Sequence, residues 1–180
     1  LESGLHFFDF ANGTLDLIAH PEAGKEHVRL NDGKVDSRGR FVVGSLDMTA
    51  VLEPVERKDR RGVLYRLDTD LTLTALDGLI ANSNGPCWSP DNRTFYFTDS
   101  VDDTVCAYEW DEASGTPGNK REFARFDKLS IPDGATVDAE GYYWCVLNGA
   151  FSGRGELRRF APDGTPDRTV PLPSTKPTSL

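Results

Sequence analysis

Long apolar runs are missing from this sequence, and their absence excludes a membrane-spanning class. No stretch of the 180 residues reaches the roughly 18 consecutive apolar residues that a membrane helix needs. The first ten residues also lack the basic start and the small-residue cleavage site of a signal peptide. They do not begin with Met, which suggests that upstream sequence is missing. We therefore expect one soluble globular unit.

Cysteine and histidine are scarce as well. The three cysteines are odd in number and set far apart in apolar or strand-like runs: Cys87, Cys106 and Cys145. This pattern favours buried reduced thiols, and hence a cytoplasmic location, over a disulfide framework. All three histidines fall within the first 27 residues, and no G-x-S-x-G motif is present. A Ser-His-Asp triad is therefore not expected.

A basic surface is also lacking. The chain has 20 basic and 29 acidic residues, a net charge of −9, and its basic residues are scattered. This distribution argues against nucleic acid as a partner. The densest basic cluster, residues 58–61, lies next to acidic residues and is expected to be a solvated loop.

No window shows sustained helical periodicity, but a repeat is present. Three segments can be laid over one another without gaps, and they begin at Asn31, Asn84 and Asp133. Each segment opens with a short polar residue, passes a turn former and continues into a β-rich run. An alternating segment and a fourth short strand follow each one. Four strands in a period of roughly 50 residues are typical of a propeller blade.

The repeat therefore predicts an all-β fold, a β-propeller of four-stranded blades. Residues 5–10 and 15–19 would be the last two strands of a preceding blade, and residues 177–179 would begin a new inner strand. About three and a half blades would then be present, with residues 1–180 forming one domain whose first and last blades are truncated. A two-sheet sandwich is the alternative, since short alternating strands occur in both folds. Open ends expose strand edges, so we expect an oligomer or a complementing segment that closes the propeller.

The repeat also predicts a metal site. The first strand of every blade lines the central channel, so Asn31, Asn84 and Asp133 should converge there. Their amide and carboxylate oxygens suit one divalent ion such as Ca²⁺, Zn²⁺, Mn²⁺ or Mg²⁺. Taken singly, Asn-Gly and Asp-Gly are more often hairpin turns. Three polar residues at matching positions, each upstream of another turn, favour a shared site.

Three motifs resemble a known family. They are R-L-N-D-G-K-V-D from Arg29, S-N-G-x-x-W-S-P-D from Ser83, and I-P-D-G-x-x-V-D-A-E-G from Ile131. Together they resemble the senescence marker protein, gluconolactonase and luciferin-regenerating enzyme-like family, which includes regucalcin, over nearly the whole chain. The resemblance implies a six-bladed propeller with one divalent ion, which hydrolyses a sugar lactone to the aldonic acid.

The resemblance also implies roles for individual residues. Asn84 and Asp133 match two metal ligands of the family, and Asp133 matches its catalytic base. Arg29 and Asn31 match residues that bind the substrate. Asp47 is the candidate for an acidic substrate-binding residue that follows the first motif in some members.

One departure from the family pattern leaves other functions open. The family's third protein ligand is a glutamate followed by Gly-Pro, whereas here Glu2 precedes Ser3 and Glu22 precedes Ala23. The alternatives are a non-catalytic calcium-binding propeller, or an arylesterase or organophosphate hydrolase on the same scaffold.

Overall fold

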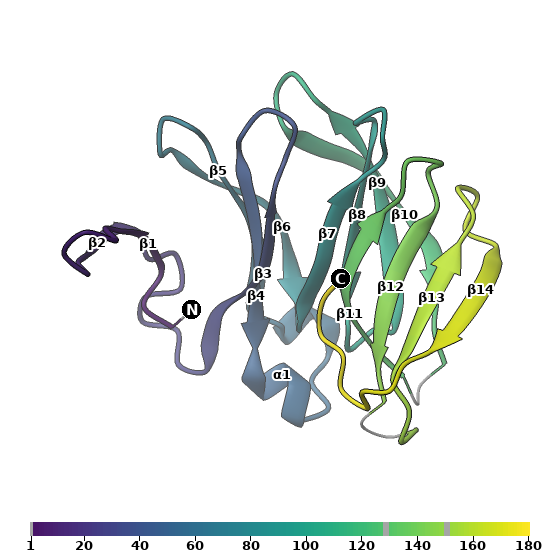
Figure 1. Cartoon of the computed structure of the whole chain (residues 1–180). Coiled ribbons are helices and arrows are strands. Elements are labelled where there is room, and N and C mark those ends of the chain that lie inside the picture. Colours follow the sequence, from purple (N-terminus) through teal and green to yellow (C-terminus); the bar gives the residue numbers. More distant parts are fainter. Residues whose placement is uncertain (1, 128–129, 150–151) are drawn as a thin grey trace.

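The computed structural model describes residues 2–127, 130–149 and 152–180, and strands dominate it (Figure 1). Three sheets of four strands follow one another along the chain, and a two-stranded sheet precedes them. All pairings are antiparallel, and the order of strands in each sheet follows the sequence. The predicted propeller of about three and a half blades is confirmed.

The elements repeat in sequence order. The two-stranded sheet contains β1 (Leu5–Phe8) and β2 (Leu15–Ala19). The first full blade contains β3 (Val28–Val35), β4 (Phe41–Asp47), β5 (Gly62–Leu67) and β6 (Leu73–Ile80). The second contains β7 (Ser83–Trp88), β8 (Thr94–Asp99), β9 (Thr104–Asp111) and β10 (Thr116–Arg125). The third contains β11 (Ile131–Val137), β12 (Tyr143–Asn148), β13 (Glu156–Phe160) and β14 (Pro166–Pro171).

The hydrophobic core lies between consecutive blades. One cluster joins the two-stranded sheet to the first blade, a second joins the first and second blades, and a third joins the second and third. The second strands of the first and second blades are therefore covered on both faces. The sequences of these strands, β4 and β8, read as nearly continuous apolar runs.

The tryptophans follow this packing in part. Trp88 and Trp110 pack with Phe95 between the first two blades. Trp144 differs, because its indole N–H donates to Asp138 and the guanidinium of Arg159 lies over its ring.

The segment between β4 and β5 is only in part the solvated loop that the sequence predicts for residues 58–61, because Lys58, Asp59 and Arg61 are exposed whereas Arg60 is held by ion pairs. It contains the short helix α1 (Met48–Leu52) and a 3-10 turn at Arg57–Asp59. Arg60 is partly buried and pairs with Asp99 at 3.1 Å and Asp102 at 2.7 Å. These ion pairs fasten the segment to the second blade, at the end of the molecule where α1 lies (Figure 1).

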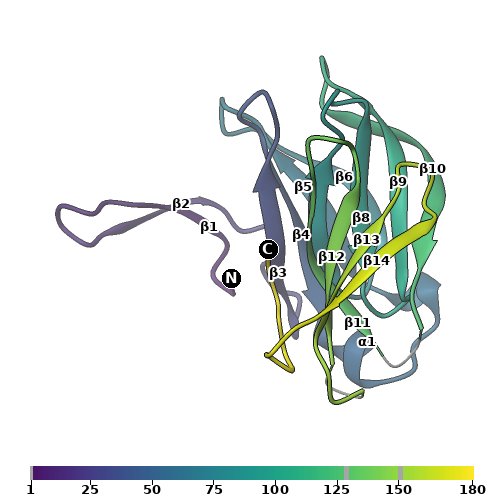
Figure 2. The ribbon, with the colours of Figure 1, turned by 45° about the vertical axis from the view of Figure 1, so that its right-hand side comes forward.

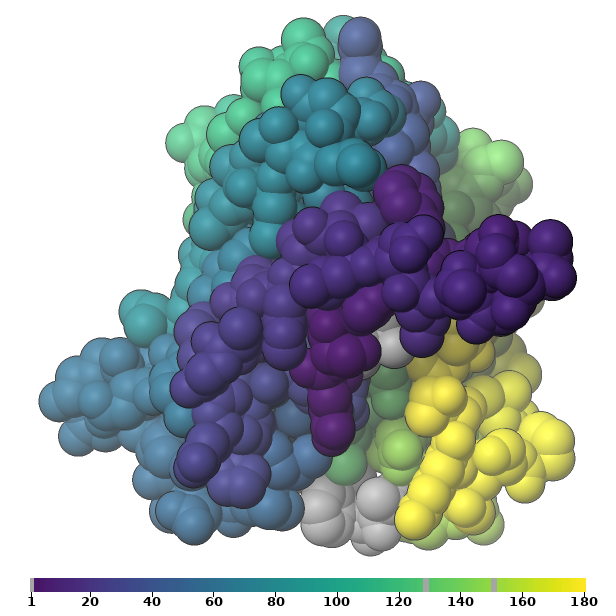
Figure 3. All heavy atoms as spheres, turned by 90° about the vertical axis from the view of Figure 1, so that its left-hand side faces the viewer, coloured from purple at the N-terminus to yellow at the C-terminus, as the bar shows by residue number. Residues whose placement is uncertain are grey.

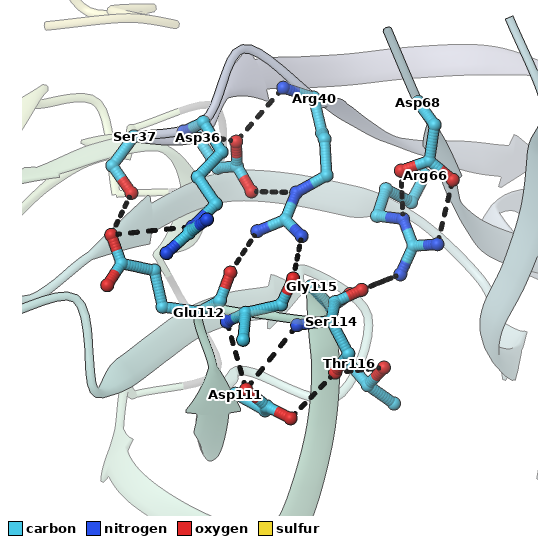
Figure 4. Close-up of polar contacts among 12 residues, drawn as sticks. Asp36, Ser37, Arg40, Arg66, Asp68, Asp111, Glu112, Ser114, Gly115 and Thr116 are labelled. Atoms are coloured by element: carbon cyan, nitrogen blue, oxygen red, sulfur yellow. Dashed lines mark hydrogen bonds and ion pairs between the residues drawn. The ribbon is translucent and has the colours of Figure 1, made fainter. Parts of the chain in front are cut away.

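Two arginines hold the first and second blades together at the turn that links β9 to β10 (Figure 4). Arg40 is buried, pairs with Asp36 at 2.6 Å and donates to the carbonyl oxygen of Glu112 at 2.8 Å. Arg66 donates to the carbonyl oxygen of Gly115 at 2.7 Å. Gly115 has a φ of +66°, and a Cβ there would lie 2.5 Å from the Arg40 guanidinium carbon. Only glycine fits this position without displacing the arginine.

The two ends of the chain lie on one face of the molecule. The β1–β2 hairpin stands away from the blades and exposes apolar side chains (Figure 2). The C-terminal residues lie near it on the same face (Figure 3). The carbonyl oxygen of Thr178 accepts a hydrogen bond from Gly134 of β11 at 3.1 Å. This is where the repeat predicts the next inner strand, although no strand is formed there.

Two expectations from composition can be compared with the structure. Within the described residues, no helix has the length and apolar character to cross a membrane. Cys87, Cys106 and Cys145 form no disulfide, as predicted.

Candidate functional site

A β-bulge interrupts each of the three inner strands at a similar point of the repeat, one residue later in β7 than in β3 and β11. The register shifts between Leu30 and Gly33 in β3, between Asn84 and Cys87 in β7, and between Pro132 and Ala135 in β11. A bulge bends the strand and re-aims the side chains beside it. The predicted site residues Asn31, Asn84 and Asp133 all lie at these bulges.

The bulge in β7 depends on a glycine. Gly85 has a φ of +60°, and a Cβ there would lie 2.8 Å from the Cβ of Ala135 and 3.0 Å from the carbonyl oxygen of Asp133. A side chain at this position would be both strained and crowded. Gly85 therefore lets β7 and β11 approach closely enough for their polar residues to meet.

Arg29, Asn31 and Asn84 form a hydrogen-bonded chain across two blades. Nη1 of Arg29 donates to Oδ1 of Asn31 at 2.9 Å. Nδ2 of Asn31 donates to Oδ1 of Asn84 at 3.0 Å and to the carbonyl oxygen of Ser83 at 2.9 Å. The structure therefore brings these three predicted residues together. Asp36, which lies seven residues after Arg29, pairs with Arg40 rather than with Arg29.

Asn84 and Asp133 meet through their oxygens. Nδ2 of Asn84 donates to Oγ of Ser100 at 2.8 Å, which turns Oδ1 of the same amide toward Asp133. In this orientation the two Oδ1 atoms are 3.1 Å apart, and in the turned orientation the amide nitrogen would donate to Asp133 over the same distance. Two acceptors at this distance repel each other unless a proton or a cation lies between them. The donor set, an amide oxygen beside a carboxylate, fits a divalent cation.

The pKa of the Asp133 carboxyl group is raised in this environment. Burial raises its pKa to about 6, the negative charge of Asp32 adds to the increase, and the backbone N–H of Gly134 opposes it. A group whose pKa is near neutrality can exchange protons at physiological pH.

Asp32 and Ser100 belong to the site although the sequence analysis did not single them out. Oδ2 of Asp32 accepts the backbone N–H of Gly85 at 2.8 Å, so it ties β3 to the bulge of β7. Asp32 follows Asn31 directly in the N-D-G motif, and this adjacency is the signal that could have identified it. No local pattern marks Ser100, since its contacts are with residues of β7 and β11.

Asp47 is not brought into this cluster. Its buried carboxylate accepts hydrogen bonds from Arg61, at 2.7 Å to Oδ1 and at 3.1 Å to Oδ2. Its pKa is lowered because these bonds and the charge of Arg61 outweigh burial, which alone would raise it. The contacts of Asp47 are those of an anchor for the segment between β4 and β5.

Glu22 is buried near the site but is engaged elsewhere. It accepts a hydrogen bond from Oγ of Ser45 and pairs with Lys25 at 2.6 Å. With Arg29 and Met48 it lines an open cavity of about 590 Å³. In the parts of the chain that the structure describes, no three His, Cys, Asp or Glu side chains gather into a metal cluster.

The fold and these polar residues define a β-propeller with an oxygen-rich site on its inner strands. The chain belongs to the SMP-30/Gluconolactonase/LRE-like family, whose model matches residues 1–180.

Relatives and solved structures agree with this assignment. The chain is 37% identical to the 6-deoxy-6-sulfogluconolactonase of Pseudomonas putida over 184 residues, which cover 100% of this chain and 58% of the relative. It is 36% identical to regucalcin of Gallus gallus over 163 residues, 90% of this chain and 53% of the relative. The chain thus spans about half the length of these relatives. The structure of regucalcin from Agrobacterium tumefaciens, a calcium-binding protein, superposes with a TM-score of 0.85 at 27% identity, over 99% of this chain and 57% of that chain.

Proposed function

We propose that this protein hydrolyses a sugar lactone to the aldonic acid with the help of one divalent metal ion. The observation that carries the proposal is the 3.1 Å approach of the Asn84 amide to Oδ1 of Asp133, which places an amide and a carboxylate, both ligands of divalent cations, side by side. The name of the P. putida relative, a lactonase of a sulfonated sugar, supports a sugar lactone as the substrate class.

Asn84 and Asp133 are the residues that would hold the metal. A bound Ca²⁺, Zn²⁺, Mn²⁺ or Mg²⁺ would polarise the ester carbonyl and stabilise the negative charge that develops on its oxygen. Asp133 would accept the proton of the attacking water, a role that suits a carboxylate with a pKa of about 6.

Arg29 and Asn31 would bind and orient the substrate. Their hydrogen bond fixes both side chains beside Asn84, so substrate oxygens bound here would lie next to the proposed metal ligands. Asp47 has no part in this proposal, because its carboxylate is held by Arg61.

Proton release from lactones tests the proposal. The full-length protein should acidify solutions of gluconolactone or xylonolactone, and a chelator should stop the reaction. Asp133→Ala should abolish both metal binding and hydrolysis. Full activity in the metal-free protein would sink the proposal, and hydrolysis of an aryl ester in place of lactones would indicate a different hydrolase.

A non-catalytic calcium-binding protein is the second candidate. It is favoured by the A. tumefaciens regucalcin, which is described as a calcium-binding protein. Calcium binding without turnover of any of these esters would favour it.

A further inference from the structure

We propose that Ser100 is a positioning residue that decides which atom of the Asn84 amide faces Asp133. This inference rests on the proposed metal site. Ser100 is buried directly after β8, and its side chain links the Asn84 amide to the backbone of Pro132, the residue before Asp133. Its Oγ donates to the carbonyl oxygen of Pro132 at 2.6 Å and accepts from Nδ2 of Asn84 at 2.8 Å.

The single proton of the serine hydroxyl makes this arrangement selective. An O–H···O contact of 2.6 Å is a short hydrogen bond, so the proton lies between Ser100 and Pro132. Oγ of Ser100 can then only accept from Asn84. The amide must present its nitrogen to Ser100, and this leaves its oxygen toward Asp133.

The opposite orientation of the amide has a specific cost. Its nitrogen would lie 3.1 Å from Oδ1 of Asp133 and would donate to it. Its oxygen would then share the one Ser100 proton with the carbonyl oxygen of Pro132. One of these two buried acceptors would then lose its hydrogen bond.

Ser100 is itself held firmly. Its backbone N–H donates to the carbonyl oxygen of Asn82 at 3.0 Å. The preceding Asp99 accepts the backbone N–H groups of Ala81 at 2.9 Å and Asn82 at 3.1 Å. The hydroxyl is therefore anchored to the start of β7, and through Pro132 it contacts the backbone that carries Asp133. One side chain thus sets the relative position of both proposed ligands.

Removal of the hydroxyl should let the amide turn. The amide nitrogen would then donate to Asp133 and compete with the metal for the carboxylate. We expect Ser100→Ala to raise the Kd for Ca²⁺ or Mn²⁺ by about 10- to 100-fold, the usual effect of losing an outer partner of a metal ligand. Ser100→Cys, which keeps the size of the side chain but donates weakly, should act in the same direction.

Thr98 supplies the matched control. It is a fully buried hydroxyl two residues earlier, and its Oγ1 contacts the phenol oxygen of Tyr143 at 3.2 Å rather than the site. Thr98→Val should lower the melting temperature and leave the Kd for either metal within about threefold of wild type. Equal Kd changes in Thr98→Val and Ser100→Ala would overturn the proposal, because they would indicate general destabilisation.

Asn84→Asp gives the decisive comparison. A carboxylate has oxygens at both ends, so its orientation no longer decides which atom faces the metal. Isothermal titration of Ca²⁺ and Mn²⁺ into the four full-length proteins, wild type, Ser100→Ala, Asn84→Asp and the double variant, measures the coupling. The serine substitution should weaken binding when Asn84 is present and should change it by less than about threefold when it is combined with Asn84→Asp. An equal loss in both backgrounds, or no loss in either, would overturn the role of Ser100. Failure of the wild-type protein to bind either metal would instead refute the proposed function.

Discussion

Replacing Asp133 with Asn should stabilise the metal-free protein while it destroys the metal site. In the metal-free state the Asp133 carboxylate is half-buried, lies 3.1 Å from the Asn84 amide, and is close enough to Asp32 for that negative charge to raise its pKa. An amide at position 133 carries no charge, and its nitrogen could donate to Asn84. The variant therefore removes a half-buried negative charge that a bound metal ion would otherwise neutralise.

The size of this effect follows from the pKa of Asp133. An increase from 3.8 to about 6 corresponds to about 3 kcal/mol if it acted in full. Because the group is only half-buried, solvent screening reduces this to about 1 to 2 kcal/mol. For a chain of this size, that is an increase of about 2 to 8 °C in melting temperature.

The difference in stability between Asp133→Asn and the wild type depends on pH. A carboxyl group whose pKa is raised by folding binds its proton more tightly in the folded state, so the folded state is favoured below about pH 4. That advantage is lost as the pH rises through about 6. Asp133→Asn should therefore be more stable than wild type at pH 7.5 and should match it at pH 4.

Thermal unfolding in chelator at the two pH values measures the difference. Asp16→Asn, which neutralises an exposed carboxylate on β2, controls for the change in net charge. Added Ca²⁺ or Mn²⁺ at about 100 times its Kd should stabilise the wild type by about 2.7 kcal/mol and leave Asp133→Asn unchanged. Equal melting temperatures of wild type and Asp133→Asn at pH 7.5, or the same difference at both pH values, would refute the reasoning.

Three further predictions concern residues that support the blades or the proposed metal site. Arg40→Met leaves the buried Asp36 carboxylate without its partner and should lower the free energy of unfolding, measured by urea denaturation, by about 3 to 5 kcal/mol. A loss below about 1 kcal/mol would contradict the role of Arg40 in holding the first two blades together. Asp32→Ala removes the acceptor for the Gly85 N–H and should weaken metal binding about tenfold in a calorimetric titration, whereas an unchanged Kd would separate Asp32 from the site. Burial alone would raise the pKa of Asp138, but hydrogen bonds from Trp144 and Arg159 outweigh burial and lower the pKa to about 2. The contribution of Asp138 to stability is therefore present above about pH 4 and is lost as the pH falls toward 2. Arg159→Gln should move acid unfolding, followed by circular dichroism, to higher pH, and an unmoved midpoint would count against this pairing.

The sequence by itself determined the fold and part of the site. Turn chemistry and strand alternation are local properties, so they gave the blade period and placed Asn31, Asn84 and Asp133 at equivalent positions. The symmetry of a propeller brings equivalent positions together, and the structure joins Asn31 to Asn84 and Asn84 to Asp133 as that symmetry requires.

Only the tertiary structure decided the supporting residues. Ser100 and Asp32 act on partners in neighbouring strands, and their contacts depend on bulges whose geometry no single segment encodes. Asp47, which the family pattern offered for substrate, pairs with Arg61, because the segment between β4 and β5 folds back onto the end of β4. Contacts between blades are set by register and packing over the whole chain, and a linear pattern does not contain them.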